Sequence, residues 1–356
     1  MRLRWLIVLV VAAATALLVT YRAEVAMWAM SRALDANMTG DAIAELPDGL
    51  HLAVCGAGAP LPAAERSGPC LAVIAGRRLF LVDSGSNGIR NLQRMGLPAG
   101  RIEAVLLTHF HSDHIDGLGE TSMLRWTAGS NSEPLPVYGP TGVERVVAGF
   151  NEAYALDATY RTAHHGALVA PPGGAGSRAM PFALPGAGAP ISLIDDGDLH
   201  IRAFVVDHEP VVPAVGYRFD YGGRSLVISG DTKESAEVER LARDVDLLAH
   251  EALAAQLVGL MNRAARDAGR DNLAHITQDI LDYHTTPEEA AAVAERAGAR
   301  HLLLYHIVPP LPLPGLATAF LEGVGDRYPG PVTLSVDGTF VTLPAGSGAI
   351  EVSQRL

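Results

Sequence analysis

The sequence predicts an α/β domain built from two layered β-sheets, and three observations support that fold class. Short apolar segments rich in branched residues alternate with segments of helical periodicity, in one block before and one block after Thr162–Pro190, a stretch dense in Gly, Ala and Pro. An apolar fraction of 49% and a charged fraction of 19% are ordinary for a globular protein with a large core. A histidine-rich motif directly follows one short apolar segment, where α/β proteins usually place their functional loops.

The first block alternates expected strands with expected helices. The strands are Leu50–Cys55, Cys70–Ala75, Arg78–Val82, Ala104–Leu107 and Val137–Pro140. The helices are Asn87–Met95, Gly117–Trp126 and Gly142–Tyr154. We expect Thr162–Pro190 to form a loop over one face of the domain, because strand signals resume directly after it.

The second block repeats this alternation without repeating the sequence. Its expected strands are Ile191–Ile194, Leu199–Val206, Ala214–Asp220, Ser225–Ile228, His301–His306, Val332–Ser335 and Phe340–Leu343. Its expected helices are Glu234–Ala242, Glu251–Ala265, Thr286–Ala297 and Leu316–Tyr328. The clearest helix start is Thr286-Pro287-Glu288-Glu289, which places threonine at the N-cap, proline first and glutamate third.

The N-terminal segment predicts export of the domain. Arg2 and Arg4 precede an uncharged apolar run, Trp5–Tyr21, that is at the short limit for a membrane-spanning helix. We favour an uncleaved signal-anchor over residues 1–22, because apolar residues follow the small residues at 14–16; a cleaved signal and a buried helix are the alternatives. Residues 23–48 would then be a linker, and residues 49–356 a domain tethered to the membrane in the periplasm or outside the cell.

The two cysteines, Cys55 and Cys70, lie on neighbouring expected strands. Export would place them in an oxidising compartment. Two interpretations stay open, a disulfide between them or two separate buried thiols.

The motif Thr108–Gly117 predicts a metal site. It places His109, His111, Asp113 and His114 within six positions, directly after the strand expected at Ala104–Leu107. Neutral imidazole nitrogens and carboxylate oxygens are ligands that zinc and similar divalent ions prefer. A six-residue motif cannot complete the coordination of such ions, so further donors are needed from elsewhere in the fold.

Three more polar residues follow apolar runs in the second block. His208 follows Leu199–Val206, Asp231 follows Ser225–Ile228, and His306 ends the strand His301–His306. Each therefore stands at a strand end, as the first motif does. We expect these donors to converge with the motif at one edge of the two sheets.

This combination of motifs resembles the metallo-β-lactamase superfamily over about Leu50 to Leu343. Within it, the chain is most similar to the ribonuclease Z and arylsulfatase-like branch, through Val215–Arg218, His250–Ala252 and His284–Thr286. The resemblance implies a four-layer αββα fold and two Zn²⁺ ions, or another divalent metal. By resemblance, one ion would take His109, His111 and His208, the second would take Asp113, His114 and His306, and Asp231 would bridge them.

The resemblance also implies hydrolytic chemistry. A hydroxide between the two ions would attack the substrate, and the ions would stabilise the charge that develops on oxygen. Asp113 would orient or deprotonate this nucleophile, and His284 would hydrogen-bond the scissile oxygens or protonate the leaving group. Asp83, after the strand Arg78–Val82, is a candidate partner for a ligand histidine.

Departures from relatives shape the expected function. β-Lactamases carry cysteine at the position of Asp231, and di-iron relatives carry glutamate at that of His111, so both activities are disfavoured. Only 22 residues separate His208 from Asp231, too few for the tRNA-binding arm of bacterial ribonuclease Z, and the net charge is −12. We therefore expect a hydrolase of small-molecule phosphodiesters or sulfate esters, with no nucleic acid partner; the alternatives are a lactone, thioester or carboxylic ester hydrolase and a metal-stabilised envelope binding protein.

Overall fold

The computed structural model describes residues 2–184 and 188–356. Contacts divide the chain into two units, Met1–Glu45 and Leu46–Leu356, and each is described by itself. The first unit contains α1 (Arg2–Thr20) and α2 (Arg22–Thr39). The second unit contains both sheets and the remaining helices.

The predicted membrane anchor over residues 1–22 lacks support from a single spanning helix. Among residues 2–184 and 188–356, none of the individual helices is both long and apolar enough to cross a membrane. Only α1 and α2 together reach that length and composition, as a pair bent by 73°.

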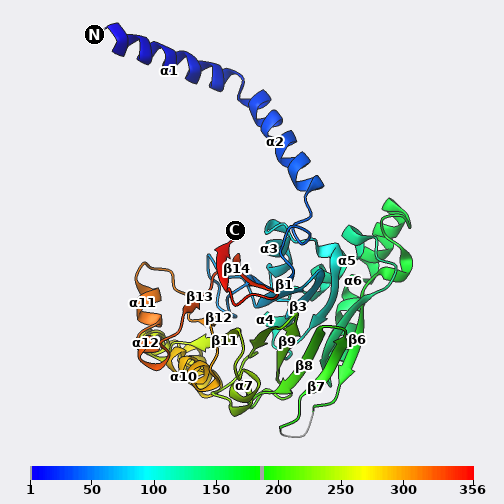
Figure 1. Cartoon of the computed structure of the whole chain (residues 1–356), viewed down its shortest axis with the longest axis vertical. Coiled ribbons are helices and arrows are strands. Elements are labelled where there is room, and N and C mark those ends of the chain that lie inside the picture. Colours follow the sequence, from blue (N-terminus) through cyan, green and yellow to red (C-terminus); the bar gives the residue numbers. More distant parts are fainter. Residues whose placement is uncertain (1, 185–187) are drawn as a thin grey trace. The chain divides into compact units, whose positions relative to one another are not determined.

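Two sheets form the centre of the second unit (Figure 1). The first has the order β15-β14-β1-β2-β3-β4-β5-β6. Its strands are β1 (Gly49–Gly56), β2 (Cys70–Ala75), β3 (Arg78–Val82), β4 (Ile102–Leu106), β5 (Leu135–Pro140), β6 (Ser177–Phe182), β14 (Thr339–Pro344) and β15 (Glu351–Gln354). The second has the order β13-β12-β11-β10-β9-β8-β7. Its strands are β7 (Ile191–Asp196), β8 (Leu199–Val205), β9 (Val215–Tyr221), β10 (Arg224–Ile228), β11 (Leu247–Leu253), β12 (Leu302–Val308) and β13 (Val332–Leu334).

Helices cover the outer faces of both sheets. The first sheet packs against α3 (Gly88–Arg94), α5 (Leu118–Gly129) and α6 (Val143–His165). The second packs against α7 (Ala236–Leu241), α10 (Pro287–Ala297), α11 (Leu316–Phe320) and α12 (Val324–Arg327). Figure 1 shows α10, α11 and α12 on one side of the domain and α5 and α6 on the other. The four-layer αββα arrangement implied by the resemblance is therefore confirmed.

The core between the sheets follows from strand alternation. On β12, Leu303 and Tyr305 face the other sheet, whereas Leu302 and Leu304 face the helices. Both sets are buried, because β12 is a central parallel strand that is covered on both faces. Its sequence is therefore a continuous apolar run without polar alternation.

Most predicted elements are confirmed, and the helix start at Thr286 is confirmed in detail. The Thr286 hydroxyl accepts a hydrogen bond from the Glu289 backbone N–H, and the Glu289 carboxylate accepts one from the Thr286 N–H. Gly298 ends α10 with a φ of 66°, a left-handed conformation that suits glycine.

Several predictions were wrong. Residues 251–253 belong to β11, and the following helix α8 (Ala255–Asp267) begins only after them. The stretch expected as a loop contains β6 and the end of α6, and the helix expected at Leu316–Tyr328 is split into α11 and α12. The short helix α9 (Asp271–Asp279) and strand β15 were not predicted.

Cys55 and Cys70 form a disulfide, with Cα atoms 5.0 Å apart. The bridge closes the loop between β1 and β2. Asp337 holds the same loop, because its carboxylate accepts hydrogen bonds from the backbone N–H groups of Ala57 and Ser67 and from the Asn91 side chain. Backbone hydrogen bonds from Gly85 to the Pro69 carbonyl oxygen and from Ile307 to the Ala57 carbonyl oxygen place this loop beside the ends of β3 and β12.

Candidate metal centre

The histidine-rich motif leaves the carboxyl end of β4. His109 and His111 lie on the loop, and the one-turn helix α4 (Ser112–Ile115) carries Asp113 and His114. The chain runs parallel in β3, β4 and β5, so the residues that follow these strands share one edge of the sheet. Asp83, directly after β3, therefore lies beside His114.

The second sheet supplies donors at the same edge. His208 follows β8, and Asp231 follows β10 after Gly230, which has a φ of 65°. A Cβ on Gly230 would approach the Val215 carbonyl oxygen to 2.5 Å, so the turn that aims Asp231 requires glycine.

His306 reaches this edge through a bulge. The register between β11 and β12 shifts at this point, so that Glu251 pairs with Tyr305 and Ala252 with Ile307. His306 is the extra residue and has a φ of 49°. Bulges re-aim side chains next to functional sites, and this one frees His306 from the sheet's alternation.

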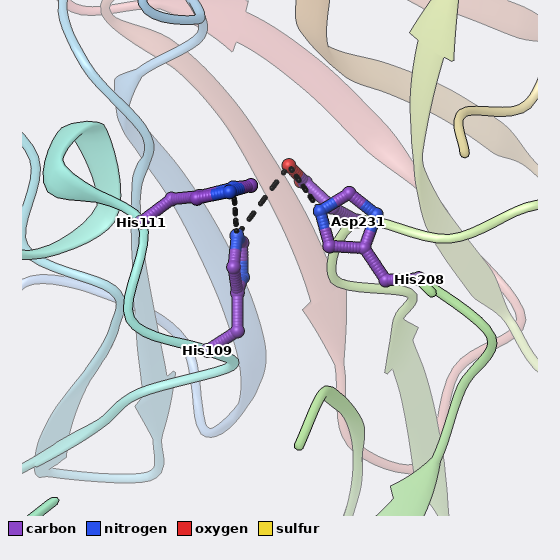
Figure 2. Close-up of side chains that lie close together, drawn as sticks. All are labelled: His109, His111, His208 and Asp231. Carbon is purple, nitrogen blue, oxygen red and sulfur yellow. Dashed lines mark hydrogen bonds and ion pairs between the residues drawn. The ribbon is translucent and has the colours of Figure 1, made fainter. Parts of the chain in front are cut away.

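The first group of donors comes from both sheets. His109, His111, His208 and Asp231 have candidate ligand atoms within 4.8 Å of one another. Figure 2 shows His109 and His111 on one side, facing Asp231 and His208 on the other. The Asp231 Oδ2 atom lies 3.8 Å from His109 Nε2 and 4.0 Å from His208 Nε2.

A second group adjoins the first. Asp113, His114 and His306 also have ligand atoms within 4.8 Å of one another. Asp231 Oδ2 lies 3.3 Å from Nε2 of both His114 and His306, so one carboxylate oxygen contacts both groups. The structure thus brings together all seven residues that the resemblance implies as ligands of two ions.

Protein oxygens fix the orientation of three of these histidines. Nδ1 of His109 lies 3.0 Å from Thr108 Oγ1, Nδ1 of His114 lies 2.8 Å from Asp83 Oδ2, and Nδ1 of His208 lies 2.9 Å from the Tyr283 carbonyl oxygen. Each ring therefore has its Nε2 among the other donors; that of His109 lies 3.0 Å from His111 Nδ1. Histidines that bind metals usually have their other nitrogen held in this way.

The donor set fits divalent cations. Within the described residues, His114 Nε2, His208 Nε2 and Asp231 Oδ1 are buried and have no hydrogen-bond partner. Buried polar atoms are rarely left unpartnered unless they serve a ligand or function. A group of imidazoles and carboxylates in this state is suited to metal ions, usually zinc.

The electrostatics of the centre point the same way. Burial lowers the pKa of His114, but Asp231, Asp83 and Asp113 outweigh it and hold this pKa well above its ordinary value. Burial lowers the pKa of His109 well below its ordinary value, and the neighbouring histidines add to this effect, although Asp231 raises the pKa. The carboxylates therefore favour positive charge at the centre, and a bound metal ion would take the place of the His114 proton.

His284 lies at the rim of the two groups, and a buried carboxylate holds it. Its Nδ1 lies 3.0 Å from Glu251 Oε1, and its ligand atom is within 4.8 Å of those of Asp231 and His306. Burial lowers the pKa of His284, but Glu251 outweighs it, so this pKa is raised. From the sequence, His250-Glu251 is expected to start a helix and to support the site. Glu251 instead belongs to β11, and its contact with His284 was not predicted.

Glu251 also fixes the backbone around His284. Its Oε1 accepts hydrogen bonds from the N–H groups of Thr232 and Thr285, at 3.2 and 3.1 Å. One side chain from β11 therefore connects the loop after Asp231 with the segment that carries His284.

Comparisons with known proteins identify the family. Residues 78–307 match the model of the beta-lactamase superfamily domain. The chain belongs to the metallo-β-lactamase superfamily. Within it, the chain belongs to the ribonuclease Z branch: it is 34% identical over 272 residues to a protein named ribonuclease Z from Mycolicibacterium gilvum, covering 74% of this chain and 85% of that protein. Ribonuclease Z from Mycobacterium avium is 35% identical over 264 residues, which cover 74% of this chain and 87% of that protein.

Solved structures share the metallo-β-lactamase fold. Human tRNase Z, short form, has a TM-score of 0.57 and 22% identity, over 83% of this chain and 99% of that chain. A metallo-β-lactamase fold protein from Bacillus subtilis also has a TM-score of 0.57, with 21% identity over 82% and 98% of the two chains.

The expected substrate class was wrong. The relatives are named ribonuclease Z, a name that denotes an enzyme acting on RNA. This finding overturns the expectation of a small-molecule phosphodiester, sulfate ester or carbonyl ester as substrate and of no nucleic acid partner. The error lay in two arguments. Net charge sums over the whole surface, whereas RNA contacts one patch of it, and a short span between His208 and Asp231 removes one RNA-binding device without removing the metal centre.

Proposed function

We propose that residues 49–356 form a metal-dependent ribonuclease that hydrolyses a phosphodiester bond of RNA, with two zinc ions held by the seven donors. The observation that carries this proposal is the Glu251–His284 pair at the rim of the donor groups. Hydrolysis of a phosphodiester needs both charge stabilisation at phosphorus and a proton for the leaving oxygen. The similarity to proteins named ribonuclease Z supports RNA as the substrate.

Two bound divalent ions would supply an activated water near neutral pH and would stabilise negative charge on the phosphate oxygens. The protein's own groups do the rest. Asp113, whose Oδ2 lies 3.4 Å from His306 Nε2, is placed to accept a proton from the attacking water. Glu251 holds His284 through Nδ1, which leaves Nε2 free to donate a proton to the leaving oxygen.

The direct test is cleavage of RNA by the purified, zinc-loaded protein. We expect endonucleolytic products from an RNA with a single-stranded 3′ extension, and none from an Asp231→Ala preparation made in parallel, which controls for contaminating nucleases. Intact RNA after incubation with protein that carries two equivalents of zinc would contradict the proposal.

We propose separately that residues 1–22 direct the domain out of the cytoplasm. The uncharged run Trp5–Tyr21 after Arg2 and Arg4 supports this location. A C-terminal fusion to a reporter enzyme that is active only after export tests it. Equal reporter activity with and without residues 1–22 would contradict export.

A further inference from the structure

A small cavity lies directly beside the donor groups, and its lining is of two chemical kinds. Its volume is about 130 Å³. The polar lining includes His111, Asp113, Asp231, His284 and His306. An apolar wall includes Leu61, Met261, Leu273, Ile276 and Ile280, and Tyr283 also lines the cavity.

Packing and hydrogen bonds between two helices hold the apolar wall in place. It comes mainly from α8 and α9, which pack against each other, and Asn262 Nδ2 on α8 donates hydrogen bonds to the Ala274 carbonyl oxygen and to Thr277 Oγ1 on α9, at 2.6 and 2.9 Å. Thr277 is the polar residue of this wall, and its hydroxyl donates to the Leu273 carbonyl oxygen at 2.8 Å. The wall therefore has no side-chain donor or acceptor free to read a polar ligand.

Tyr283 supplies a flat surface at the junction. Its ring centroid lies 5.1 Å from that of His208 and 4.9 Å from that of His284. The Tyr283 carbonyl oxygen accepts from His208 Nδ1, which ties the ring's backbone to the donor groups. The phenol ring is thus held next to the place where a phosphate would meet the metal ions.

The size of the cavity limits what can enter. A closed apolar cavity of about 150 Å³ in another protein holds one benzene molecule. The cavity of about 130 Å³ includes the space next to the metal-ligand atoms, so it has room for at most one flat six-membered ring, and that ring must be joined to a group that reaches the donors.

We propose that this cavity, which we call the base pocket, takes the base of a nucleotide adjoining the scissile phosphate. The inference rests on the proposed function and names the substrate group next to the cut. Unpaired bases in RNA stack on aromatic side chains, and such stacking tolerates any base. Because the apolar wall has no free polar group, this wall favours a planar ring and does not itself contact the polar edge of the base.

The test is binding of nucleotide fragments to the zinc-loaded full chain, measured by calorimetry. The probes are uridine 5′-monophosphate, uridine 3′-monophosphate, cytidine 5′-monophosphate, ribose 5-phosphate and butyl phosphate. We expect at least one uridine isomer to bind about tenfold or more tightly than ribose 5-phosphate, as one base-stacking contact implies. The preferred isomer shows on which side of the cut the base lies.

Matched variants assign the effect to the pocket. We expect Tyr283→Ala to remove the tenfold preference and Tyr283→Phe to keep it, because phenylalanine retains the ring. Ile276→Asp on the apolar wall should weaken nucleotide binding while leaving ribose 5-phosphate binding unchanged. Zinc content and thermal unfolding of each variant are measured in parallel, so that loss of the metal centre is recognised.

Three results would overturn the proposal. In the first, the nucleotides bind no more tightly than ribose 5-phosphate, or neither binds. In the second, butyl phosphate binds as tightly as the nucleotides. In the third, the Tyr283→Ala variant still prefers nucleotides to ribose 5-phosphate. RNA cleavage is assayed on the same preparations. Cleavage without a base preference would reject the base pocket and keep the ribonuclease, whereas nucleotide binding without cleavage would reject the ribonuclease and keep the pocket.

Discussion

The two sheets contribute to the metal centre in different ways. The first sheet supplies its donors from one loop after β4, where His109, His111, Asp113 and His114 are sequence neighbours. The second sheet supplies His208, Asp231 and His306 from the ends of β8 and β10 and from β12, which are far apart in the chain. The loop donors are arranged by local backbone geometry, whereas the others meet only when the second sheet has formed.

This difference shows which residue joins the two donor groups. Asp231 Oδ2 is within 4.0 Å of Nε2 atoms in both donor groups, whereas His111 belongs to one group only. The local motif supplies four donors but completes neither group, and Asp231 from the other sheet contacts both. Each prediction below tests one part of that contrast.

The largest effect is expected from Asp231→Ala. Because this carboxylate contacts both donor groups, the variant should lose both metal equivalents and reduce kcat/KM for RNA by at least about a thousandfold. His111→Ala, the matched change in the loop, should lose only one equivalent. Metal content is measured by mass spectrometry on protein whose circular dichroism is native. If both variants lose the same amount of metal, the loop and the second sheet are equivalent contributors.

A smaller loss of activity is expected from breaking the Glu251–His284 pair, which belongs to the second-sheet side of the centre. His284→Ala and Glu251→Gln should each lower kcat by about a hundredfold or more, because a proton donor is removed or its supporting charge is lost. Metal content should stay at the wild-type level in both.

The double variant separates this role from simple disruption. If Glu251 acts through His284, the double variant should be no slower than the worse single variant. Effects that multiply would show that Glu251 serves the backbone of Thr232 and Thr285 alone.

The first sheet's support of its own donors is tested by Asp83→Asn. The Asp83 carboxylate accepts from Thr108 and contacts His114 Nδ1 at 2.8 Å, so the variant should weaken metal affinity about 10- to 100-fold. Glu103→Gln, which alters a carboxylate on β4 that pairs with Arg78, is the matched control and should not change affinity. Competition with a zinc chelator measures both. Equal affinities in the two variants would contradict the role of Asp83.

What the sequence could predict follows the same contrast. The loop donors share one short motif, and His208, Asp231 and His306 each follow an apolar run. The sequence alone could therefore predict these residues as metal donors at strand ends. Glu251 was misread because the residues after it favour a helix, while β11 is a strand through its parallel pairing with β10 and β12. Such pairing depends on residues distant in the chain and overrides local propensity.

The apolar wall of the base pocket was hidden for a related reason. Met261 and Ile276 belong to helices whose exposed and buried faces are set by packing of α8 on α9. The sequence predicted helical spacing near Met261 but contained no sign that this hairpin would lie beside the metal donors. Position relative to a site requires the tertiary fold.

The smallest effect concerns a buried histidine of the first sheet that lies outside the motif. His51 on β1 donates through Nε2 to the Pro47 carbonyl oxygen, and its Nδ1 is buried without a partner. The pKa of His51 is lowered to about 4, mainly by burial; Arg355 and Arg77 also lower it, whereas the hydrogen bond to Pro47 and the charge of Asp48 raise it. Three carboxylates outweigh the effect of burial on the pKa of His114, whereas Asp48 raises the pKa of His51 by too little to reverse that effect.

The sign of the pH dependence follows from that lowered pKa. The unfolded chain binds a proton at His51 below about pH 6.5, whereas the folded chain stays neutral until about pH 4, so acidification favours unfolding across this window. Between pH 7 and 5.5 the contribution is about 1 kcal/mol of unfolding free energy. His51→Gln keeps a donor for the Pro47 carbonyl and cannot titrate, so its urea unfolding free energy should fall less over the same interval, by about that amount. An identical fall in the two proteins would mean that folding does not lower the pKa of His51.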